Sequence, residues 1–174
     1  MIPPPGYPRS WSAIPTGTYS DDGAQVLCLL EHLATSEFDG NTFYATLQRW
    51  LEDGYMASGG VMFDCGNQTM AALRNGHVEA LNEERFNGNG SLMRALPVAL
   101  VCDTPDEICK VSFLHSSVTH PHIRSKLCCA LYSLVVHFTL NGWHLPMAIT
   151  LATNHLNSWL VAPEDIDELN YIID

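Results

Sequence analysis

Apolar side chains recur at helical spacing along most of this sequence. Val26, Leu27, Leu30 and Leu33 share one face of a helix over 21–36, because residues three and four apart lie on the same side of a helix. The same spacing, bounded by capping residues, glycines and prolines, predicts further helices at 42–53, 67–75, 77–85, from 91 onward with a kink at Pro97, 105–116, from 119 or 121 to 140, 145–156 and 163–172. No segment alternates apolar and polar residues as a half-buried strand does. The pattern predicts an all-α fold.

Proline content divides the chain into two parts. The first 19 residues hold five of the ten prolines, and proline removes the backbone N–H that a helix interior needs. Residues 1–19 are therefore predicted to form an extended arm. Residues 20–174 are predicted to form a single helical domain, since 174 residues with 47% apolar content are ordinary for one hydrophobic core.

The charge balance argues against two classes of partner. Eight Lys and Arg against 19 Asp and Glu give a formal charge of −11, which leaves little basic surface for nucleic-acid phosphates or anionic lipid. The longest apolar stretch, 127–140, is shorter than the roughly 20 residues of a membrane span. We expect no nucleic-acid binding and no membrane binding.

Cysteine spacing and the first residues bear on the compartment. The six cysteines lack the recurring spacing of a disulfide framework. The start of the chain shows no basic flank followed by an apolar run, as a secretory signal would. We expect reduced thiols and a cytoplasmic location.

Ser20, Asp21 and Asp22 form a first polar cluster, directly before an apolar helix. A hydroxyl and two carboxylates are hard oxygen ligands of the kind that Mg²⁺ and Mn²⁺ prefer. The same residues are also typical of a helix start, where Ser is an N-cap and acids favour the helix dipole. The residues alone leave both interpretations open.

A second cluster is the glycine-rich segment 88–94, Gly-Asn-Gly-Ser-Leu-Met-Arg, which leads into a predicted helix. Glycines allow close approach to the backbone, and free N–H groups at a helix start attract phosphate or carboxylate. Arg94 is expected to add donors to such a ligand or to pair with one of the many acids. An ordinary turn with an N-cap explains the same residues.

Two further polar points remain. His120 and His122 precede the long apolar helix, where they could ligate zinc or simply be hydrogen-bonded at a helix start; the first interpretation is weakened by the absence of a CxxC pair or an HExxH helix. Asp64 is either an acid near the start of the helix at 67–75 or an acid that faces a ligand.

Together and in this order, four segments resemble the ADP-ribosylglycohydrolase family. They are Gly17-Thr18-Tyr19-Ser20-Asp21-Asp22, then Phe63-Asp64-Cys65-Gly66-Asn67-Gln68-Thr69 with Ala72-Leu73, then Gly88-Asn89-Gly90-Ser91-Leu92-Met93-Arg94 with Pro97, and finally Thr119-His120. The resemblance implies a compact orthogonal bundle of helices. It also implies an enzyme that releases ADP-ribose from a modified side chain or a related conjugate, with Mg²⁺ or Mn²⁺ as cofactor.

The resemblance also implies roles for particular residues. Ser20, Asp21 and Asp22 would be metal ligands, and Asp21, Asp22 and Asp64 would be the catalytic carboxylates. The residues that would line the ADP-ribose cleft are Asn89, Gly90, Ser91, Met93 and His120. The expected partner is an ADP-ribosylated protein or conjugate, and helix-start N–H groups behind the glycine loop would hold the diphosphate.

The sequence departs from the family pattern at two places. It shows no Gly-Asp-Ala-x-Gly-like helix before Ser20 and no Asp-x-Asp-Ser/Thr segment near its end. We therefore expect about half of the usual metal ligands, and apolar surface through which the protein self-associates. Three alternatives stay open: an active hydrolase, an inactive relative that binds ADP-ribose or a protein, and a helical interaction module without a ligand.

Overall fold

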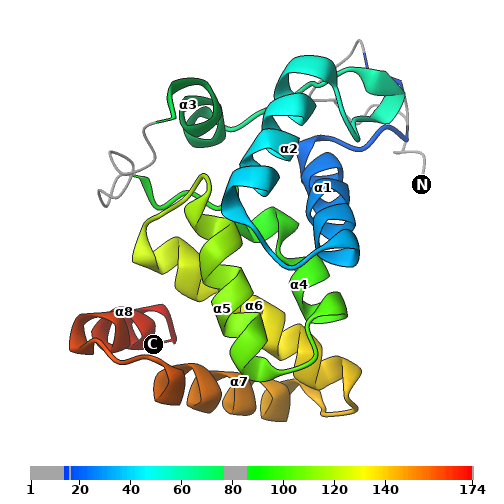
Figure 1. Cartoon of the computed structure of the whole chain (residues 1–174). Helices are drawn as coiled ribbons and strands as arrows, with labels where there is room; N and C mark the ends of the chain where they lie inside the picture. Colours follow the sequence, from blue (N-terminus) through cyan, green and yellow to red (C-terminus); the bar gives the residue numbers. More distant parts are fainter. Residues whose placement is uncertain (1–13, 16, 77–85, 174) are drawn as a thin grey trace, which may run out of the picture.

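The computed structural model describes residues 14–15, 17–76 and 86–173, and this part of the chain is built from α-helices and short 3₁₀ turns without a strand (Figure 1). The prediction of an all-α fold is confirmed. The elements are α1 (Asp21–Thr35), α2 (Gly40–Asp53), η1 (Ser58–Gly60), α3 (Asn67–Asn75), η4 (Leu92–Arg94), α4 (Leu96–Val101), α5 (Pro105–Ser117), α6 (Ile123–Leu140), α7 (Leu145–Trp159) and α8 (Pro163–Ile173).

Helix α6 is the centre of the larger half of the molecule. It packs against α5, α7, α4 and α8, while α1 packs against α2 and α4 (Figure 1). By length and composition α6 could also cross a membrane, but a buried core helix passes the same test. Fully buried Leu127, Ala130 and Leu134 on α6 belong to one hydrophobic cluster with Leu29 of α1 and Phe43 of α2. The contacts of α6 are those of a core helix.

Local chemistry sets the helix ends near the site. The Asp39 side chain caps α2 by accepting from the N–H of Thr42 at 2.8 Å, and Thr104 caps α5 by accepting from the N–H of Glu107 at 3.2 Å. Helix α2 ends at Gly54, which has a left-handed φ of 68°. A Cβ at Gly54 would lie 2.1 Å from the carbonyl oxygen of Gly60, so the chain needs glycine there to turn toward α3.

Three predicted boundaries need correction. The segment from Ser91 is not one kinked helix, because the η4 turn ends at Arg94 and α4 begins anew with Pro97 in its first turn, where proline costs no hydrogen bond. Helix α6 begins at Ile123 because His122 is its N-cap. Helix α7 extends to Trp159 rather than ending at 156. The predicted helix at 77–85 and residues 1–13 of the predicted arm lie outside the described residues.

Candidate functional site

A small polar pocket of about 250 Å³ is lined by five of the predicted site residues, whereas Ser20, Asp22, Asp64 and Ser91 do not line it. It lies between the start of α1, the start of α3, the glycine loop before η4 and the segment that joins α5 to α6. Its lining residues are Asp21, Gly66, Asn67, Gln68, Thr69, Gly88, Asn89, Gly90, Met93 and His120. Segments that are distant in the sequence therefore meet at one place. The four motifs in the sequence do not reveal this proximity by themselves.

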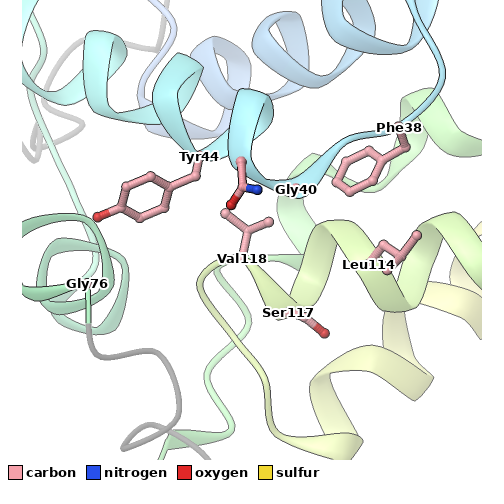
Figure 2. A pocket seen from close by; sticks show the side chains of 8 residues that line it. Phe38, Gly40, Tyr44, Gly76, Leu114, Ser117 and Val118 are labelled. Atoms are coloured by element: carbon pink, nitrogen blue, oxygen red, sulfur yellow. The ribbon is translucent and has the colours of Figure 1, made fainter.

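A second pocket, of about 460 Å³, is larger but chemically poorer. Figure 2 shows Phe38, Tyr44, Leu114 and Val118 around it, from α2, α5 and the turn before α2. Its described lining holds one titratable side chain, Tyr44, whose hydroxyl already donates to the carbonyl oxygen of Leu73 at 3.0 Å. None of the predicted site residues line it. The smaller pocket is therefore the better candidate for chemistry.

We call Asp21, which lines the small pocket, together with its neighbours Ser20, Asp22 and Asp64, which do not line it, the acidic rim. Ser20 precedes α1, but its side chain makes no cap hydrogen bond; its hydroxyl donates to Asp22 Oδ2 at 3.1 Å. Burial raises the pKa of the Asp21 carboxyl, and the charges of Asp22 and Asp64 raise it further. The backbone of Asp64 takes a left-handed φ of 58°, which Asp tolerates better than most residues. The neighbouring carboxylates therefore make Asp21 harder to ionise.

The opposite side is the glycine loop. The N–H of Gly88 donates to Gln68 Oε1 at 3.3 Å, and Gln68 Nε2 donates to the carbonyl oxygen of Thr119 at 3.4 Å. A Cβ at Gly90 would lie 2.8 Å from Cε1 and 2.9 Å from Nε2 of His120. Glycine at position 90 therefore lets the loop lie directly against the imidazole.

Two backbone N–H groups behind the loop are not available to a ligand. The N–H groups of Leu92 and Met93 both donate to the carbonyl oxygen of Asn89, at 3.0 and 3.3 Å. The expectation that N–H groups at this helix start hold a diphosphate is wrong for these two. Ser91 is also fully buried: its hydroxyl shares a 2.8 Å hydrogen bond with that of Ser116 and accepts from Cys129 Sγ at 3.4 Å. Ser91 supports the loop from below and does not line the pocket.

Beneath the pocket lies a buried network of five polar residues: Gln25, Arg94, His115, Thr119 and His120. Arg94 is fully buried and donates to Gln25 Oε1 at 2.8 Å, to the carbonyl oxygen of His115 at 2.9 Å and to Thr119 Oγ1 at 2.8 Å. Its guanidinium also lies 5.5 Å from the centre of the Phe43 ring. The expectation that Arg94 reaches a ligand or pairs with an acid is corrected, because its hydrogen bonds go to neutral oxygens inside the protein.

Both histidines of the buried network are neutral. Burial and the charge of Arg94 lower the pKa of His120 to about 3, and burial lowers the pKa of His115 well below its ordinary value. His120 Nδ1 lies 2.8 Å from Thr119 Oγ1, whereas neither ring nitrogen of His115 has a hydrogen-bond partner within the described residues. His122 caps α6, since its Nδ1 accepts from the N–H of Arg124 at 3.2 Å. Of the two interpretations of His122, this hydrogen bond supports a histidine that caps a helix and not a zinc ligand.

The Mg²⁺ or Mn²⁺ ion that the resemblance implies would have to bind at the acidic rim. Its oxygen donors suit a hard cation, and a cation would offset the burial and the charges of Asp22 and Asp64 that raise the pKa of Asp21. However, residues 14–15, 17–76 and 86–173 contain no group of three or more His, Cys, Asp or Glu side chains placed to hold a metal ion. The rim offers oxygen donors of a suitable kind but, within the described residues, no grouping of ligands that shows a metal site.

Some pocket residues had no role assigned from the sequence. Gly66, Asn67, Gln68 and Thr69 all line the pocket, and they fall inside the second segment that carried the family resemblance. Gln25 was not predicted; the signal for it is a fully buried amide next to Ala24, Cys28 and Leu29 on the inner face of α1. A polar side chain on an apolar helix face marks a buried partner.

Fold and site together define an all-α protein with a polar pocket lined by Asp21, the start of α3, a glycine loop and His120. The sequence model of the ADP-ribosylglycohydrolase family matches residues 2–172. This chain belongs to the ADP-ribosylglycohydrolase family.

A curated relative gives a more distant comparison. The ADP-ribosylarginine hydrolase Tri1 of Serratia proteamaculans (strain 568) is 26% identical over 133 residues, which cover 72% of this chain and 36% of the relative. The chain therefore spans about a third of the length of the curated relative that it matches. The family and the relative are both named for hydrolysis of ADP-ribose linkages.

Proposed function

We propose that this chain hydrolyses the glycosidic bond between ADP-ribose and a modified side chain or related conjugate, with Mg²⁺ or Mn²⁺ as cofactor. Arginine is the linkage to test first, because the curated relative is an ADP-ribosylarginine hydrolase. The observation that carries the proposal is the shared pocket, in which Asp21 and His120 face one space across the glycine loop. At about 250 Å³, this pocket is smaller than the roughly 300–1,000 Å³ of whole-ligand sites, so it suits the sugar end of the ligand.

The proposed reaction needs carboxylates beside the sugar. The bond from ribose C1 to the side-chain nitrogen breaks, a bond from C1 to a water oxygen forms, and the water proton ends on the leaving nitrogen. Positive charge develops on the sugar ring in the transition state, and carboxylates nearby stabilise it. Asp21 lines the pocket, and Asp22 and Asp64 lie close enough to influence its pKa. We assign the catalytic carboxylates to these three residues.

The remaining assignments follow from position. Ser20, Asp21 and Asp22 would hold the cation, which when bound would supply electrostatic stabilisation of ribose oxygens. Asn89, Gly90 and Met93 line the pocket opposite the rim and would contact the ligand. Ser91 supports the loop from the buried side. Self-association and a cytoplasmic location stay predictions.

A second candidate is binding of ADP-ribose without turnover. It is favoured by one observation: the described residues contain no group of three or more ligating side chains that would hold a metal ion by themselves. The third alternative, a helical module without a ligand, requires Ser20 merely to cap α1, but Ser20 makes no cap hydrogen bond.

A calorimetric titration with ADP-ribose, with and without Mg²⁺, separates these functions. The hydrolase predicts metal-dependent binding and release of ADP-ribose from an ADP-ribosylarginine substrate. Binding without release leaves the second candidate, and no binding in either condition excludes both. The double variant Asp21→Asn with Asp22→Asn is expected to abolish the metal dependence. The double variant Asp103→Asn with Asp106→Asn removes two carboxylates between α4 and the first turn of α5 and serves as the matched control.

The glycine loop provides a steric test of the same pocket. We expect Gly90→Ala to weaken ADP-ribose binding at least about tenfold, because its Cβ would meet Cε1 and Nε2 of His120 at 2.8 and 2.9 Å. Gly88→Ala is the matched control, since its Cβ would meet the movable end of Gln68 at 3.0 Å, and we expect a smaller loss. Equal affinity for wild type and Gly90→Ala would place the ligand elsewhere.

A further inference from the structure

The imidazole of His120 has two different sides. On one side, Nδ1 lies 2.8 Å from Thr119 Oγ1 in the buried network. On the other side, Nε2 faces the pocket next to Gly88 and Gly90, where a Cβ would lie 3.6 and 2.9 Å from it. Within the described residues, Nε2 makes no hydrogen bond with the protein. The proton on this ring therefore decides what the pocket presents to a ligand at this point.

Hydrogen-bond accounting from Arg94 determines where that proton is. A guanidinium can only donate, so Thr119 Oγ1 accepts from Arg94 Nη2 at 2.8 Å. The Thr119 hydroxyl keeps one proton of its own, and His120 Nδ1 is the acceptor within reach. The opposite arrangement, with Nδ1 donating, would place two donors on the hydroxyl oxygen. It would also leave the hydroxyl proton unpaired at a fully buried residue, which is costly.

We propose that Arg94 is a positioning residue that acts through Thr119 to fix His120 as the tautomer with its proton on Nε2. His120 then presents an uncharged N–H donor to the pocket. The ligand group it suits is an oxygen acceptor, such as a hydroxyl or phosphate oxygen of the nucleotide sugar. The assignment of a ligand oxygen as the acceptor rests on the proposed function, whereas the assignment of the tautomer does not.

The charge state agrees with this assignment. The pKa of His120 is lowered to about 3 by burial and by the charge of Arg94, so the ring holds one proton throughout the neutral range. The groups around it are Thr119, Arg94, the neutral His115, and Gln68 and Asp21, which line the same pocket. A ring whose Nε2 already carries the proton is a donor and does not serve as a general base at that atom.

Long-range ¹H–¹⁵N spectra of the imidazoles test the tautomer directly, in the ligand-free protein. At pH 7 we expect His120 to show one tautomer, with Nε2 protonated and Nδ1 unprotonated, and no titration down to pH 5. The spectrum of His120→Gln identifies the signal by its loss. A proton on Nδ1, or a mixture of tautomers, in the wild-type protein would overturn the proposal without any variant.

Substitutions at Thr119 test how the tautomer is fixed. Thr119→Val keeps the shape and removes the hydroxyl, and it should produce a mixture of tautomers; Thr119→Ser should restore the single one. If Arg94 and Thr119 serve only stability, Thr119→Val will lower the unfolding free energy and leave the tautomer unchanged, which refutes the positioning role. If Thr119→Val does not fold, the wild-type spectrum still shows which ring nitrogen of His120 carries the proton.

The role in binding has its own readout. Thr119→Val should weaken ADP-ribose binding about tenfold, the typical effect of one hydrogen bond to a charged group, and Thr119→Ser should recover the affinity. Unchanged affinity in Thr119→Val, together with a changed tautomer, would refute the donor role. If the wild type does not bind ADP-ribose, the proposed function fails while the spectra still test the tautomer.

Discussion

The acidic rim and the buried network each contribute one residue to the same pocket, Asp21 and His120, but they are built in opposite ways. The rim is half-buried or exposed, and burial, followed by the charges of Asp22 and Asp64, raises the pKa of Asp21. The network is almost entirely buried, and Arg94 makes three hydrogen bonds to fixed neutral oxygens. The rim gathers carboxylates near one another. The network is held by the hydrogen bonds of Arg94, but Arg94 Nε, Gln25 Nε2 and both ring nitrogens of His115 have no partner within the described residues. Catalytic sites commonly combine a reactive part with a supporting part of this kind.

This difference predicts that the unfolding free energy depends strongly on the buried network and hardly on the acidic rim. The largest effect is expected from Arg94→Lys, which keeps the positive charge. Lysine cannot reach three acceptors in the plane of a guanidinium, and the lost bonds to a charged group sum to about 3 kcal/mol of unfolding free energy. Urea denaturation measures it. The exposed Arg74→Lys is the control, with an expected change within about 0.5 kcal/mol.

A small loss of unfolding free energy in Arg94→Lys would contradict the idea that the buried network stabilises the fold. If its unfolding free energy stays within about 0.5 kcal/mol of the wild type, as for a surface substitution, then the hydrogen bonds of Arg94 only offset the cost of burying its charge. The network would then be a specificity device and not a source of stability.

The second prediction concerns acid sensitivity. His115 has a folded-state pKa well below its ordinary value of 6.5, so the unfolded state binds its proton first and stability falls as the pH drops below about 6.5. That loss is about 1.4 kcal/mol per pH unit for one histidine. His115→Leu removes it and also removes two unpaired ring nitrogens. Relative to the wild type, the variant should therefore gain about 2 kcal/mol of unfolding free energy between pH 7 and pH 5.

Urea denaturation of both proteins at the two pH values measures this difference, and the titration of all other groups is shared by the pair. An equal pH dependence in wild type and variant would show that His115 is protonated in the folded state. In that case the buried network would contain a second positive charge beside Arg94. Like the rim, it would then hold like charges close together.

Most of the fold was predictable from the sequence because helices are local. Periodic apolar positions found the described helices, and the Thr104 cap with Pro105 marked the start of α5 correctly. Errors arose where local signals were ambiguous: Pro97 is compatible with a kink or with a helix start, and His122, not Thr119 or Pro121, caps α6.

The site was predictable only in part. The order of four motifs indicated the family, and the structure brings Asp21, Asn89, Gly90, Met93 and His120 to one pocket. The environment of Arg94 was not predictable, because its partners Gln25 and Thr119 come from α1 and from the end of α5. Sequence spacing carries no information on such long-range contacts, so an arginine after a glycine loop resembled a ligand-binding residue.

The smallest effect tests whether the rim has a structural role at all. Ser20 precedes α1 as a cap residue but donates to Asp22 instead of accepting from the helix, whereas Thr104 accepts from the N–H of Glu107. Loss of a true N-cap costs about 1 kcal/mol. We therefore expect Thr104→Ala to lower the unfolding free energy by about 1 kcal/mol and Ser20→Ala to change it by less than about 0.5 kcal/mol, both measured by urea denaturation without metal. Equal losses of unfolding free energy in the two variants would show that Ser20 is an ordinary helix cap. Ser20, Asp21 and Asp22 would then be explained as well by capping as by metal binding.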